Sequence, residues 1–434
     1  MTIINSTVIV ADDLTGANDT ALQYFKNNLS ARIIIDCSKE FSDVEDVDIW
    51  AISTESRNIS KEESVDRIVW VVNRIKERLG IDNYYKKIDS TLRGNVGVEI
   101  VTLMEMLSVD AVIVSPAYIE EGWSTIGAYQ LLNGTPIERT QCALDPKAPI
   151  YESYIPNIIA KDLNDKFVEL IDTIDFKTVA KGAGPITVKI NELIQKGKKI
   201  FIADACSNTD LEQIALAINK SNFNILPVGS AGLANAFNRE KNIETEAKNI
   251  EIPKLARLII SGSATKMSAT QIEKLREEKK NTIFVDLEAK DIFEPIDENR
   301  INSIADSLNK GTDVVVHCAK IKKEFDNEET NDILIDAGIA RHDFANKITD
   351  FLGELLKKIN SKCNFNLILI GGETSYKCLD SIGSTYLEIL DAIMPSIPLC
   401  IDKNGKIIVT KSGNFGTANT MLDILNYFDK AKNV

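Results

Sequence analysis

The sequence predicts an α/β protein with two domains, each built on a mostly parallel sheet. Short runs rich in Val and Ile alternate with longer amphipathic stretches along the chain, which is typical of parallel strands joined by helices that cover both faces of a sheet. The 434 residues are enough for two or three domains of about 150 residues each. A polar, charge-dense stretch at 238–254 divides the pattern, and we expect domains at 1–238 and 253–434.

The first half carries short apolar runs that predict strands, separated by stretches with helical periodicity. Ligands of parallel α/β sheets bind outside the carboxyl ends of the strands, so we expect functional residues directly after these runs. The expected strands are 7–11, 31–35, 48–53, 83–87, 111–115, 200–204 and 224–228, and the expected helices include 17–27, 61–79 and 209–218.

The second half repeats the alternation of strands and helices. The chain shows no low-complexity tract and no short-period repeat, so a second α/β unit is expected after the polar stretch. The expected strands are 257–261, 281–285, 313–317, 366–370 and 406–410, and the expected helices are 266–280, 301–309, 343–358 and 417–428.

Composition and charge exclude several classes of protein. Hydrophobic residues make up 44% and charged residues 26% of the chain, as in globular proteins and not in disordered ones. The 50 basic and 64 acidic residues give a net charge of −14. We therefore expect no nucleic-acid partner and no membrane partner, because both favour a basic surface. The first residues show no secretory signal, and no apolar run is long enough to span a membrane.

Cysteine and histidine usage narrows the chemistry. The seven cysteines are scattered, odd in number and free of any CxxC pattern, which favours a reduced, cytoplasmic protein. The two histidines, His317 and His342, argue against a multi-histidine metal site and against a Ser-His-Asp triad. None of these features excludes a homo-oligomer.

Four segments, 229–232, 261–263, 371–374 and 411–416, share a strand, a turn of small residues and a helix start. Glycine lets the backbone approach a ligand closely, and the first N–H groups of a helix can bind phosphate. One such turn is ordinary chain reversal, but several at one sheet edge favour a nucleotide site. No P-loop and no GxGxxG pattern occurs. Lys411 either faces a phosphate or is a solvated loop lysine.

Two adjacent carboxylates, Asp12 and Asp13, follow the first predicted strand, and a Gly-Ala helix start comes next. Adjacent residues of an extended segment point to opposite sides, so we expect these two to serve different neighbours. One would orient or deprotonate a hydroxyl, and the other would cap the helix. The alternative is that Asp13 is only an N-cap and Asp19 a surface residue, whereas for Asp12 we favour the functional role.

A basic turn follows the strand that ends at Lys87. Its cationic and hydroxyl side chains lie before a helix at 98–107, an arrangement that suits a carboxylate or a phosphate. Arg57, which follows another strand, either adds a planar fork for a carboxylate or lies at the surface. The residues of the basic turn are Lys87, Asp89, Ser90, Thr91 and Arg93.

The segment 116–149 is expected to be irregular, with glycines at 122, 127 and 134 and a tryptophan at 123. Long irregular segments inside a compact domain are usually functional or mobile. The segment would therefore be a lid over a polar substrate, or else decoration of the surface.

Together these segments resemble the four-carbon acid sugar kinase family. The resemblance covers nearly the whole chain in the same order, and ADDLTGANDTA at 11–21 and KIDSTLRGNVG at 87–97 are its most specific motifs. The further matching motifs are NGTPIERTQCALDPKAPIYES at 133–153, GSAGLA at 229–234, SGSAT at 261–265, GGETS at 371–375 and KSGNFG at 411–416.

The resemblance implies an ATP-dependent kinase that phosphorylates a hydroxyl of a small sugar acid, such as threonate, erythronate or a 3-oxo-tetronate, in carbohydrate-acid catabolism. The N-terminal domain would bind the acid and the C-terminal domain the nucleotide, with ATP and Mg²⁺ as cofactors. The expected acid contacts are Asp12, Asp13, Arg57, Lys87, Asp89, Ser90, Thr91 and Arg93. The expected ATP contacts are Ser261, Gly262, Ser263, Gly371, Gly372, Glu373, Thr374, Lys411, Gly413, Asn414 and Gly416.

The chain departs from the family pattern in two places. Residues 118–125 lack the usual Gly-Arg-Thr and carry Trp123 instead, which leaves the identity of the acid open. Asn414 stands where glycine is usual, a tolerable change because asparagine adopts left-handed conformations. These changes concern the substrate and not the class of enzyme.

Phosphoryl transfer mainly requires positioning and charge neutralisation. Asp12 is the first candidate for the group that accepts the hydroxyl proton, and Asp89 is the second. One alternative is a ribokinase-like sugar kinase, because DLTGAND is similar to DTxGAGD; that element belongs near the chain's end there, whereas here it starts at Asp13. The other alternative is a sugar-acid sensor that has lost turnover, for which the altered 118–125 segment is the support.

Overall fold

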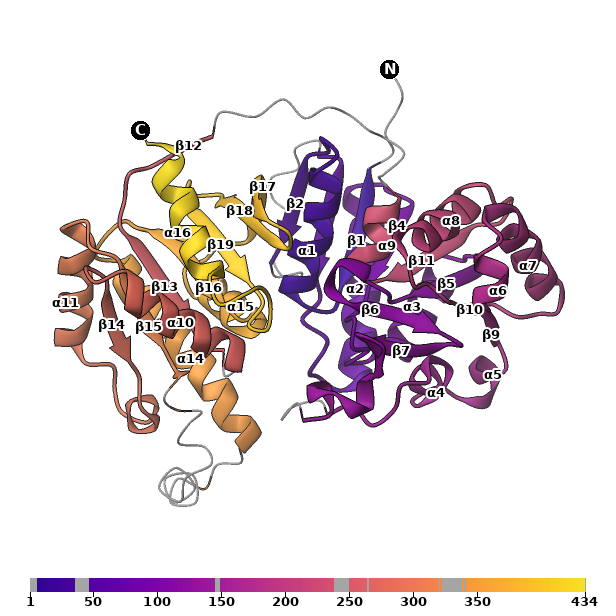
Figure 1. Cartoon of the computed structure of the whole chain (residues 1–434), viewed down its shortest axis with the longest axis horizontal. Helices are drawn as coiled ribbons and strands as arrows, with labels where there is room; N and C mark the ends of the chain where they lie inside the picture. The colour runs from indigo at the N-terminus through magenta and orange to yellow at the C-terminus, as the bar shows by residue number, and fades with distance from the viewer. Residues whose placement is uncertain are drawn as a thin grey trace. The chain divides into compact units, whose positions relative to one another are not determined.

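The computed structural model describes residues 6–35, 47–144, 149–237, 250–263, 265–319, 321, 338 and 341–433. The chain divides into two compact units, Met1–Thr245 and Glu246–Val434. Figure 1 colours the first unit from indigo to magenta and ends the second in yellow. Residues 238–249 of the predicted linker lie outside the described residues, so the boundaries proposed within it stay a prediction.

The first unit is built on a parallel sheet. Its strands lie in the order β2-β3-β1-β4-β11-β5-β10-β9, and all neighbours in this order are parallel. Because β3, β1 and β4 are adjacent, their carboxyl ends lie side by side. The strands are β1 (Thr7–Ala11), β2 (Ala31–Ile34), β3 (Ile49–Ser53), β4 (Asn83–Lys87), β5 (Ala111–Ser115), β9 (Ile171–Ile174), β10 (Ile200–Ala203) and β11 (Ile225–Gly229).

Helices connect these strands in two groups. One group packs α1 on α9, α9 on α8 and α8 on α7, and the other packs α2 on α3 and α3 on α4. Capping boxes start α2 at Ser60 and α8 at Ser207, since each serine and the acid three residues later satisfy each other's backbone N–H. The helices are α1 (Leu14–Phe25), α2 (Lys61–Arg78), α3 (Val96–Met106), α4 (Ile155–Ala160), α5 (Asp165–Val168), α6 (Phe176–Val179), α7 (Ala183–Gln195), α8 (Asn208–Asn219) and α9 (Ala231–Ala236).

The segment expected to be irregular instead forms a small antiparallel sheet, with strands in the order β6-β7-β8. These strands are short and are separated by residues with left-handed backbone, namely Gly127 and Ala128 between β6 and β7 and Asn133 and Gly134 between β7 and β8, so no regular alternation marks them in the sequence. The elements are η1 (Ile119–Glu121), β6 (Trp123–Ile126), β7 (Tyr129–Leu132), β8 (Thr135–Pro136), η2 (Ile137–Arg139) and η3 (Gln141–Leu144).

The second unit has a mixed sheet in the order β14-β15-β13-β16-β19-β18-β17. Pairing is parallel from β14 to β19, and the hairpin β17–β18 continues it in the antiparallel sense. The sequence analysis missed this hairpin. The strands are β13 (Arg257–Ser261), β14 (Ile283–Asp286), β15 (Val314–His317), β16 (Asn366–Ile370), β17 (Tyr386–Met394), β18 (Ile397–Asp402) and β19 (Ile407–Lys411), with a separate pair β12 (Glu251–Ile252) and β20 (Lys432–Asn433).

Two helices of the second unit, α10 and α16, pack against a core of aliphatic side chains from the central strands, including Ile259, Ile368 and Val409. Among the described residues, no helix has the length and apolar character needed to cross a membrane. The helices are α10 (Lys266–Glu278), η5 (Ala289–Ile292), α11 (Glu298–Asn309), α14 (Arg341–Asn360), α15 (Gly372–Ser381) and α16 (Thr420–Lys430).

Candidate functional site

The acidic turn and the basic turn of the first unit come together at one sheet edge. Asp12 follows β1, Arg57 lies shortly after β3, and Asp89 follows β4. Since these three strands are neighbours, the side chains that follow them converge, as expected at the carboxyl ends of parallel strands. We call this group the acid cluster: Asp12, Asp13, Arg57, Lys87, Asp89, Ser90, Thr91 and Arg93.

Arg57 is the centre of the acid cluster. Its Nε and Nη2 donate to the two oxygens of Asp12 at 2.7 and 3.0 Å, and its Nη1 lies 2.7 Å from Oδ2 of Asp13. Nη2 also lies 3.9 Å from Oδ1 of Asp89. Arg57 is therefore not an isolated surface arginine, because its guanidinium lies among three carboxylates.

The backbone explains how Arg57 reaches this place. The amides of Ser56 and Arg57 both donate to the carbonyl oxygen of Asp12, at 2.9 and 3.3 Å, and so the loop after β3 wraps around the end of β1. A Cβ on Gly94 would lie 3.2 Å from the Cα of Arg57, and its φ of 91° also favours glycine.

The two adjacent aspartates do not serve separate neighbours, contrary to the expectation, because both pair with Arg57. Asp13 additionally accepts the N–H of Gly16 at 2.7 Å and caps α1, which therefore starts earlier than predicted. Asp13 thus caps the helix and also takes part in the cluster.

The two aspartates have different proton affinities. Burial alone would raise the pKa of Asp12, which is 3% exposed, but the charge and hydrogen bonds of Arg57, with Lys86 and Lys87, hold that pKa below its usual value. Burial raises the pKa of Asp13, and the neighbouring charge of Asp12 adds to this, while Arg57 and Lys87 oppose it.

Asp89 has its own arginine. Arg93 donates to it through Nε at 2.7 Å and Nη2 at 3.2 Å, and Thr91 donates its hydroxyl to the same carboxylate. Burial opposes ionisation of Asp89, but Arg93 and Arg57 outweigh it and hold the pKa of this carboxyl well below its usual range. Asp89 is therefore ionised at neutral pH, and it holds Arg93 in place.

Lys87 lies beside the start of α1. Its Nζ donates to the carbonyl of Ile88 at 2.8 Å, and a Cβ on Gly16 would lie 3.2 Å from this Nζ and 2.7 Å from Oδ1 of Asp13. Glycine at position 16 thus lets the lysine approach the helix N-terminus. Lys87, Arg57 and Arg93 give the cluster three cations, which suit the carboxylate of a small acid.

The β6–β7 hairpin is tied to the acid cluster by one side chain. Gln130, which is fully buried, donates its amide to the carbonyl of Ser90 at 2.9 Å and accepts the hydroxyl of Thr125 at 2.7 Å. On its other side the hairpin rests on Asp204, which accepts the N–H groups of Gly127 and Ala128, both at 2.8 Å.

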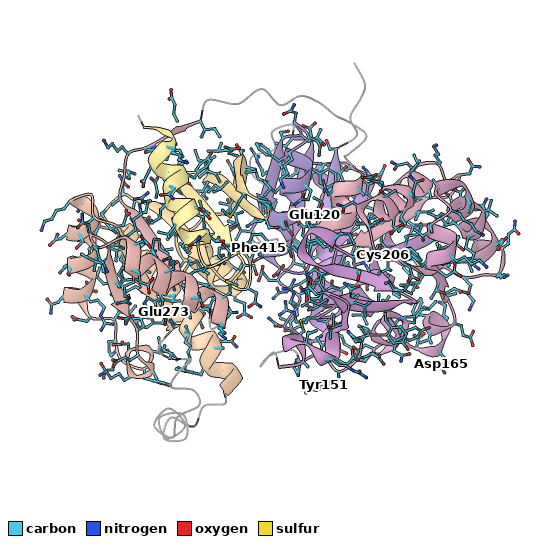
Figure 2. All side chains as sticks on the ribbon, in the orientation of Figure 1. Glu120, Tyr151, Asp165, Cys206, Glu273 and Phe415 are labelled. Atoms are coloured by element: carbon cyan, nitrogen blue, oxygen red, sulfur yellow. The ribbon has the colours of Figure 1, made fainter. Side chains whose placement is uncertain are left out.

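Aromatic side chains are exposed on the hairpin and on the segment that pairs with it. Tyr129 on β7 is exposed, and its ring centroid lies 5.0 Å from that of Tyr154 in the paired segment, where Tyr151, labelled in Figure 2, is 81% exposed. Glu120, labelled in the same figure, accepts the amide of Asn208 at 3.1 Å. The hairpin is therefore fastened to the unit at several points.

Sequence reasoning missed Gln130 and Glu55 as members of this neighbourhood. Glu55 lies between β3 and Arg57 and accepts the N–H of Leu14 at 2.8 Å. A signal was present in the sequence, because Glu55 occupies the same post-strand position as Arg57. No comparable signal marks Gln130 in the sequence.

Three of the glycine turns meet in the second unit, because β13, β16 and β19 are neighbours. A Cβ on Gly413 would lie 2.1 Å from Oγ of Ser263, and a Cβ on Gly262 would lie 2.3 Å from Oγ1 of Thr374. The hydroxyl of Thr265 also donates to the carbonyl of Gly413 at 2.9 Å. The turns after β13, β16 and β19 are packed against one another, and we call them the turn cluster.

The fourth turn, at 229–232, belongs to the first unit. Cβ atoms on Gly229 and Gly232 would lie 2.5 and 2.4 Å from the carbonyls of Ser115 and Ala117. These glycines serve close packing of the first unit, and this turn is separate from the turn cluster.

The helix that follows β16 has an open N-terminus. Gly371, its N-cap, has a φ of 110° and makes no side-chain cap hydrogen bond, whereas Thr265 caps α10 through its hydroxyl at 3.2 Å from the N–H of Ser268. Uncapped N–H groups at a helix start are suited to phosphate oxygens. The first turn of α15, which holds Gly372, Glu373 and Thr374, therefore fits a nucleotide phosphate.

Lys411 is buried, so the alternative of a solvated loop lysine is wrong. Its side chain is 1% exposed, and its Nζ donates to the carbonyls of Ser412 at 2.6 Å and Phe415 at 2.9 Å; Figure 2 labels Phe415. Burial lowers the pKa of Lys411 to about 7. Lys411 therefore stabilises the turn through its hydrogen bonds to these two carbonyls.

Asn414 is exposed and is not among the residues with positive φ, so the backbone at this position does not require glycine. The left-handed position of this turn is Gly416, with a φ of 90°. A Cβ there would lie 2.2 Å from Oγ1 of Thr420.

Among the described residues, no group of three or more His, Cys, Asp or Glu side chains is arranged to hold a metal ion.

Comparison with known proteins matches the two units to two different kinds of domain. Residues 7–237 match the family model of a sugar-binding N-terminal domain, and residues 258–421 match that of a nucleotide-binding C-terminal domain.

Curated relatives span almost the whole chain. The D-threonate kinase of Salmonella typhimurium is 25% identical over 432 residues, covering 98% of both chains. The D-erythronate kinase of Heliobacterium modesticaldum is 23% identical, covering 98% of this chain and 97% of the relative. The 3-oxo-tetronate kinase of Cupriavidus necator is 22% identical, covering 94% and 93%.

Solved structures share the fold. A protein from Salmonella typhimurium LT2 gives a TM-score of 0.78 at 20% identity, covering 97% of this chain and 99% of the other. A protein from Haemophilus influenzae gives a TM-score of 0.72 at 22% identity, covering 97% and 100%.

Proposed function

The chain belongs to the four-carbon acid sugar kinase family, with its sugar-binding N-terminal and nucleotide-binding C-terminal domains, and we propose that it transfers the terminal phosphoryl group of ATP to a hydroxyl of a four-carbon sugar acid. Threonate, erythronate and the 3-oxo-tetronates are the candidate acceptors, since relatives named for these acids match nearly the full chain. The observation that carries the proposal is the convergence of Arg57, Lys87 and Arg93 with three carboxylates after adjacent strands.

In this proposal the cations of the acid cluster bind the carboxylate of the substrate. The forks of Arg57 and Arg93 already hold Asp12 and Asp89, so these arginines would attract the substrate's carboxylate through their charge, and Lys87 adds a point charge beside the start of α1. The hydroxyls of Ser90 and Thr91 lie in the same turn and would bond to substrate hydroxyls.

Asp12 remains the first candidate for the carboxylate that takes the hydroxyl proton, and Asp89 the second. Phosphoryl transfer passes through a loose transition state in most enzymes, so the attacking oxygen needs positioning more than early deprotonation. The pKa of Asp12 lies below its usual value, which suits a group that accepts a hydrogen bond from the hydroxyl and receives its proton late. Asp89 is already held by Arg93 and Thr91.

The nucleotide would bind at the turn cluster. The open N-terminus of α15 would hold phosphate oxygens through backbone N–H groups, and Ser261, Ser263 and Gly413 would line the neighbouring turns. Mg²⁺, when bound, neutralises charge on the phosphates and usually keeps several water ligands. A dedicated cage of protein carboxylates is therefore not required by this chemistry.

The two earlier alternatives have less support. A ribokinase-like enzyme would carry its DTxGAGD element near the nucleotide, whereas DLTGAND here starts α1 in the domain that matches a sugar-binding model. A sensor that binds the acid without turnover would use the same acid cluster. An assay of turnover with a panel of acids separates such a sensor from a kinase.

The test is an ADP-release assay with a panel of acids: threonate, erythronate, their 3-oxo forms and 4-hydroxythreonine. We expect ATP-dependent turnover with at least one of them. Gly372→Val serves as the control, because a branched side chain in the first turn of α15 would block the approach of phosphate. Tight binding of an acid without any turnover would favour the sensor, and turnover unchanged in Gly372→Val would exclude the nucleotide site at α15.

A further inference from the structure

Glu55 occupies a strained position beside the acid cluster. Its φ is 45°, in the left-handed region that side-chain-bearing residues rarely adopt. Arg67 on α2 holds the peptide there, since its Nη1 donates to the carbonyls of Thr54 at 2.7 Å and Glu55 at 2.9 Å. Strain of this kind persists where the surroundings fix it, and it concentrates at functional sites.

The strained backbone aims the side chain of Glu55 at the start of α1. Its Oε1 accepts the N–H of Leu14 at 2.8 Å and the hydroxyl of Ser53 at 2.6 Å. Leu14 is the first residue of α1, and its N–H has no partner within the helix. The carboxyl of Glu55 therefore fastens the end of β3 to the turn that carries Asp12 and Asp13.

The charges around Glu55 make a further anion unfavourable. Asp12 and Asp13 lie on the turn that it touches, and Arg57 on its own loop directs Nε, Nη2 and Nη1 to these two aspartates. Lys87, the last residue of β4, has its Nζ close to Asp13. Burial and the charge of Asp13 raise the pKa of Glu55 to about 8, although its hydrogen bonds and Arg57 oppose this.

We propose that Glu55 is a positioning residue of the acid site that carries its proton while the acid binds, so that it fastens the first turn of α1 without adding negative charge beside Asp13. The inference rests on the proposed function, because the ligand concerned is an anionic acid. An ionised Glu55 would repel that acid and would also compete with it for the cations of the cluster.

Two substitutions separate the fastening from the charge. Glutamine has the shape of a protonated glutamic acid, and its oxygen can accept both bonds, so Glu55→Gln at pH 7 should leave the KM for the acid and kcat close to those of the wild type. Glu55→Ala removes both bonds and should raise the KM for the acid about tenfold or more. Glu62→Gln, an exposed acid on α2, is the control and should change neither constant.

The dependence of the KM for the acid on pH distinguishes this role from a merely structural one, which would leave that dependence unchanged. In the wild type the KM for the acid should rise as the pH passes through about 8, because Glu55 then ionises. In Glu55→Gln this rise should be absent. The proposal is wrong if Glu55→Gln is as impaired as Glu55→Ala at pH 7, or if its KM rises with pH as the wild type's does.

A measurement without turnover keeps this inference separate from the proposed function. A carboxyl whose pKa is raised by folding stabilises the protein at low pH and loses that contribution as the pH rises toward its folded value. The unfolding midpoint of the wild type should therefore fall relative to Glu55→Gln between about pH 4.3 and pH 8. Parallel midpoints would overturn the proposal, whereas a panel of acids without turnover would refute only the kinase function.

Discussion

Arg57 holds both carboxylate oxygens of Asp12, with Nε 2.7 Å from Oδ2 and Nη2 3.0 Å from Oδ1. This bidentate pair joins the end of β1 to the loop after β3, and it fixes the carboxylate proposed to receive the hydroxyl proton. Removing the negative charge of Asp12 therefore tests the mechanism directly.

Asp12→Asn should lower kcat by about 10²–10⁴-fold, because the amide cannot take up a proton. The amide oxygen can still accept from Arg57, so the fold should persist. Turnover is measured by ADP release, and circular dichroism checks the fold. A folded variant with near-normal turnover would remove Asp12 from this role.

Arg93→Lys should raise the KM for the acid by about tenfold and change kcat much less, since lysine cannot replace a planar fork that binds Asp89 through two nitrogens. Initial rates over a range of acid concentrations give both constants. Arg78→Lys at the exposed end of α2 is the matched control. An unchanged KM in Arg93→Lys would place this arginine outside the acid site.

The buried pair Lys86–Glu99, with Nζ 2.6 Å from Oε2, should be needed for stability. Lys86→Met removes the cationic partner of Glu99, and loss of one partner of such a pair costs about 3–5 kcal/mol. Adding Glu99→Gln removes the stranded charge, and its oxygen can still accept from Ser56 and Ser64, which bond to Glu99. Thermal unfolding should show the double variant to be more stable than Lys86→Met. The opposite order would contradict this account.

Gly413→Ala should destabilise the turn cluster and weaken nucleotide binding, because the new Cβ would lie 2.1 Å from Oγ of Ser263. Adding Ser263→Gly removes that atom and should restore the unfolding midpoint. Gly184→Ala on α7, where no atom lies within 4 Å of the new Cβ, is the control. Equal midpoints for Gly413→Ala and Gly184→Ala would mean that the turns do not pack as described.

Lys411 should make the stability of the protein depend on pH in the alkaline range. Its pKa is lowered to about 7 in the folded state, while an unfolded lysine titrates near about 10.4. Between these values the unfolded chain binds more protons, so folding becomes more favourable as the pH rises. The unfolding midpoint of the wild type should rise relative to Lys411→Met between pH 7 and about pH 10. A constant difference would show that the lysine stays charged in the fold.

The sequence was sufficient for the features that depend on local pattern. The strand before Asp12 and the strand that ends at Lys87 were predicted with the bounds that the structure gives them, because each is a short run of residues that favour strands, followed by a polar turn. The role of Asp13 as the N-cap of α1 was one of the two readings offered and is confirmed.

Features that depend on distant contacts could not be predicted. That Arg57 binds both aspartates follows from two backbone bonds to the carbonyl of Asp12, which no spacing reveals. Gly413 was predicted to contact a ligand, but its immediate neighbour is Ser263. The antiparallel hairpin β17–β18 was missed because most residues of β17 are half-buried and all but one of β18 are buried, so neither strand alternates regularly between buried and exposed positions.

The way the β6–β7 hairpin is fastened has a consequence for redesign. Its attachments to Ser90 and Asp204 use main-chain groups at one end of each contact: the carbonyl of Ser90 and the amides of Gly127 and Ala128. Any sequence that keeps Gln130 and the turn geometry can therefore make the same attachments. The hairpin of a relative could therefore replace this one without loss of these attachments, provided that Gln130, Asp204 and the turn geometry are kept.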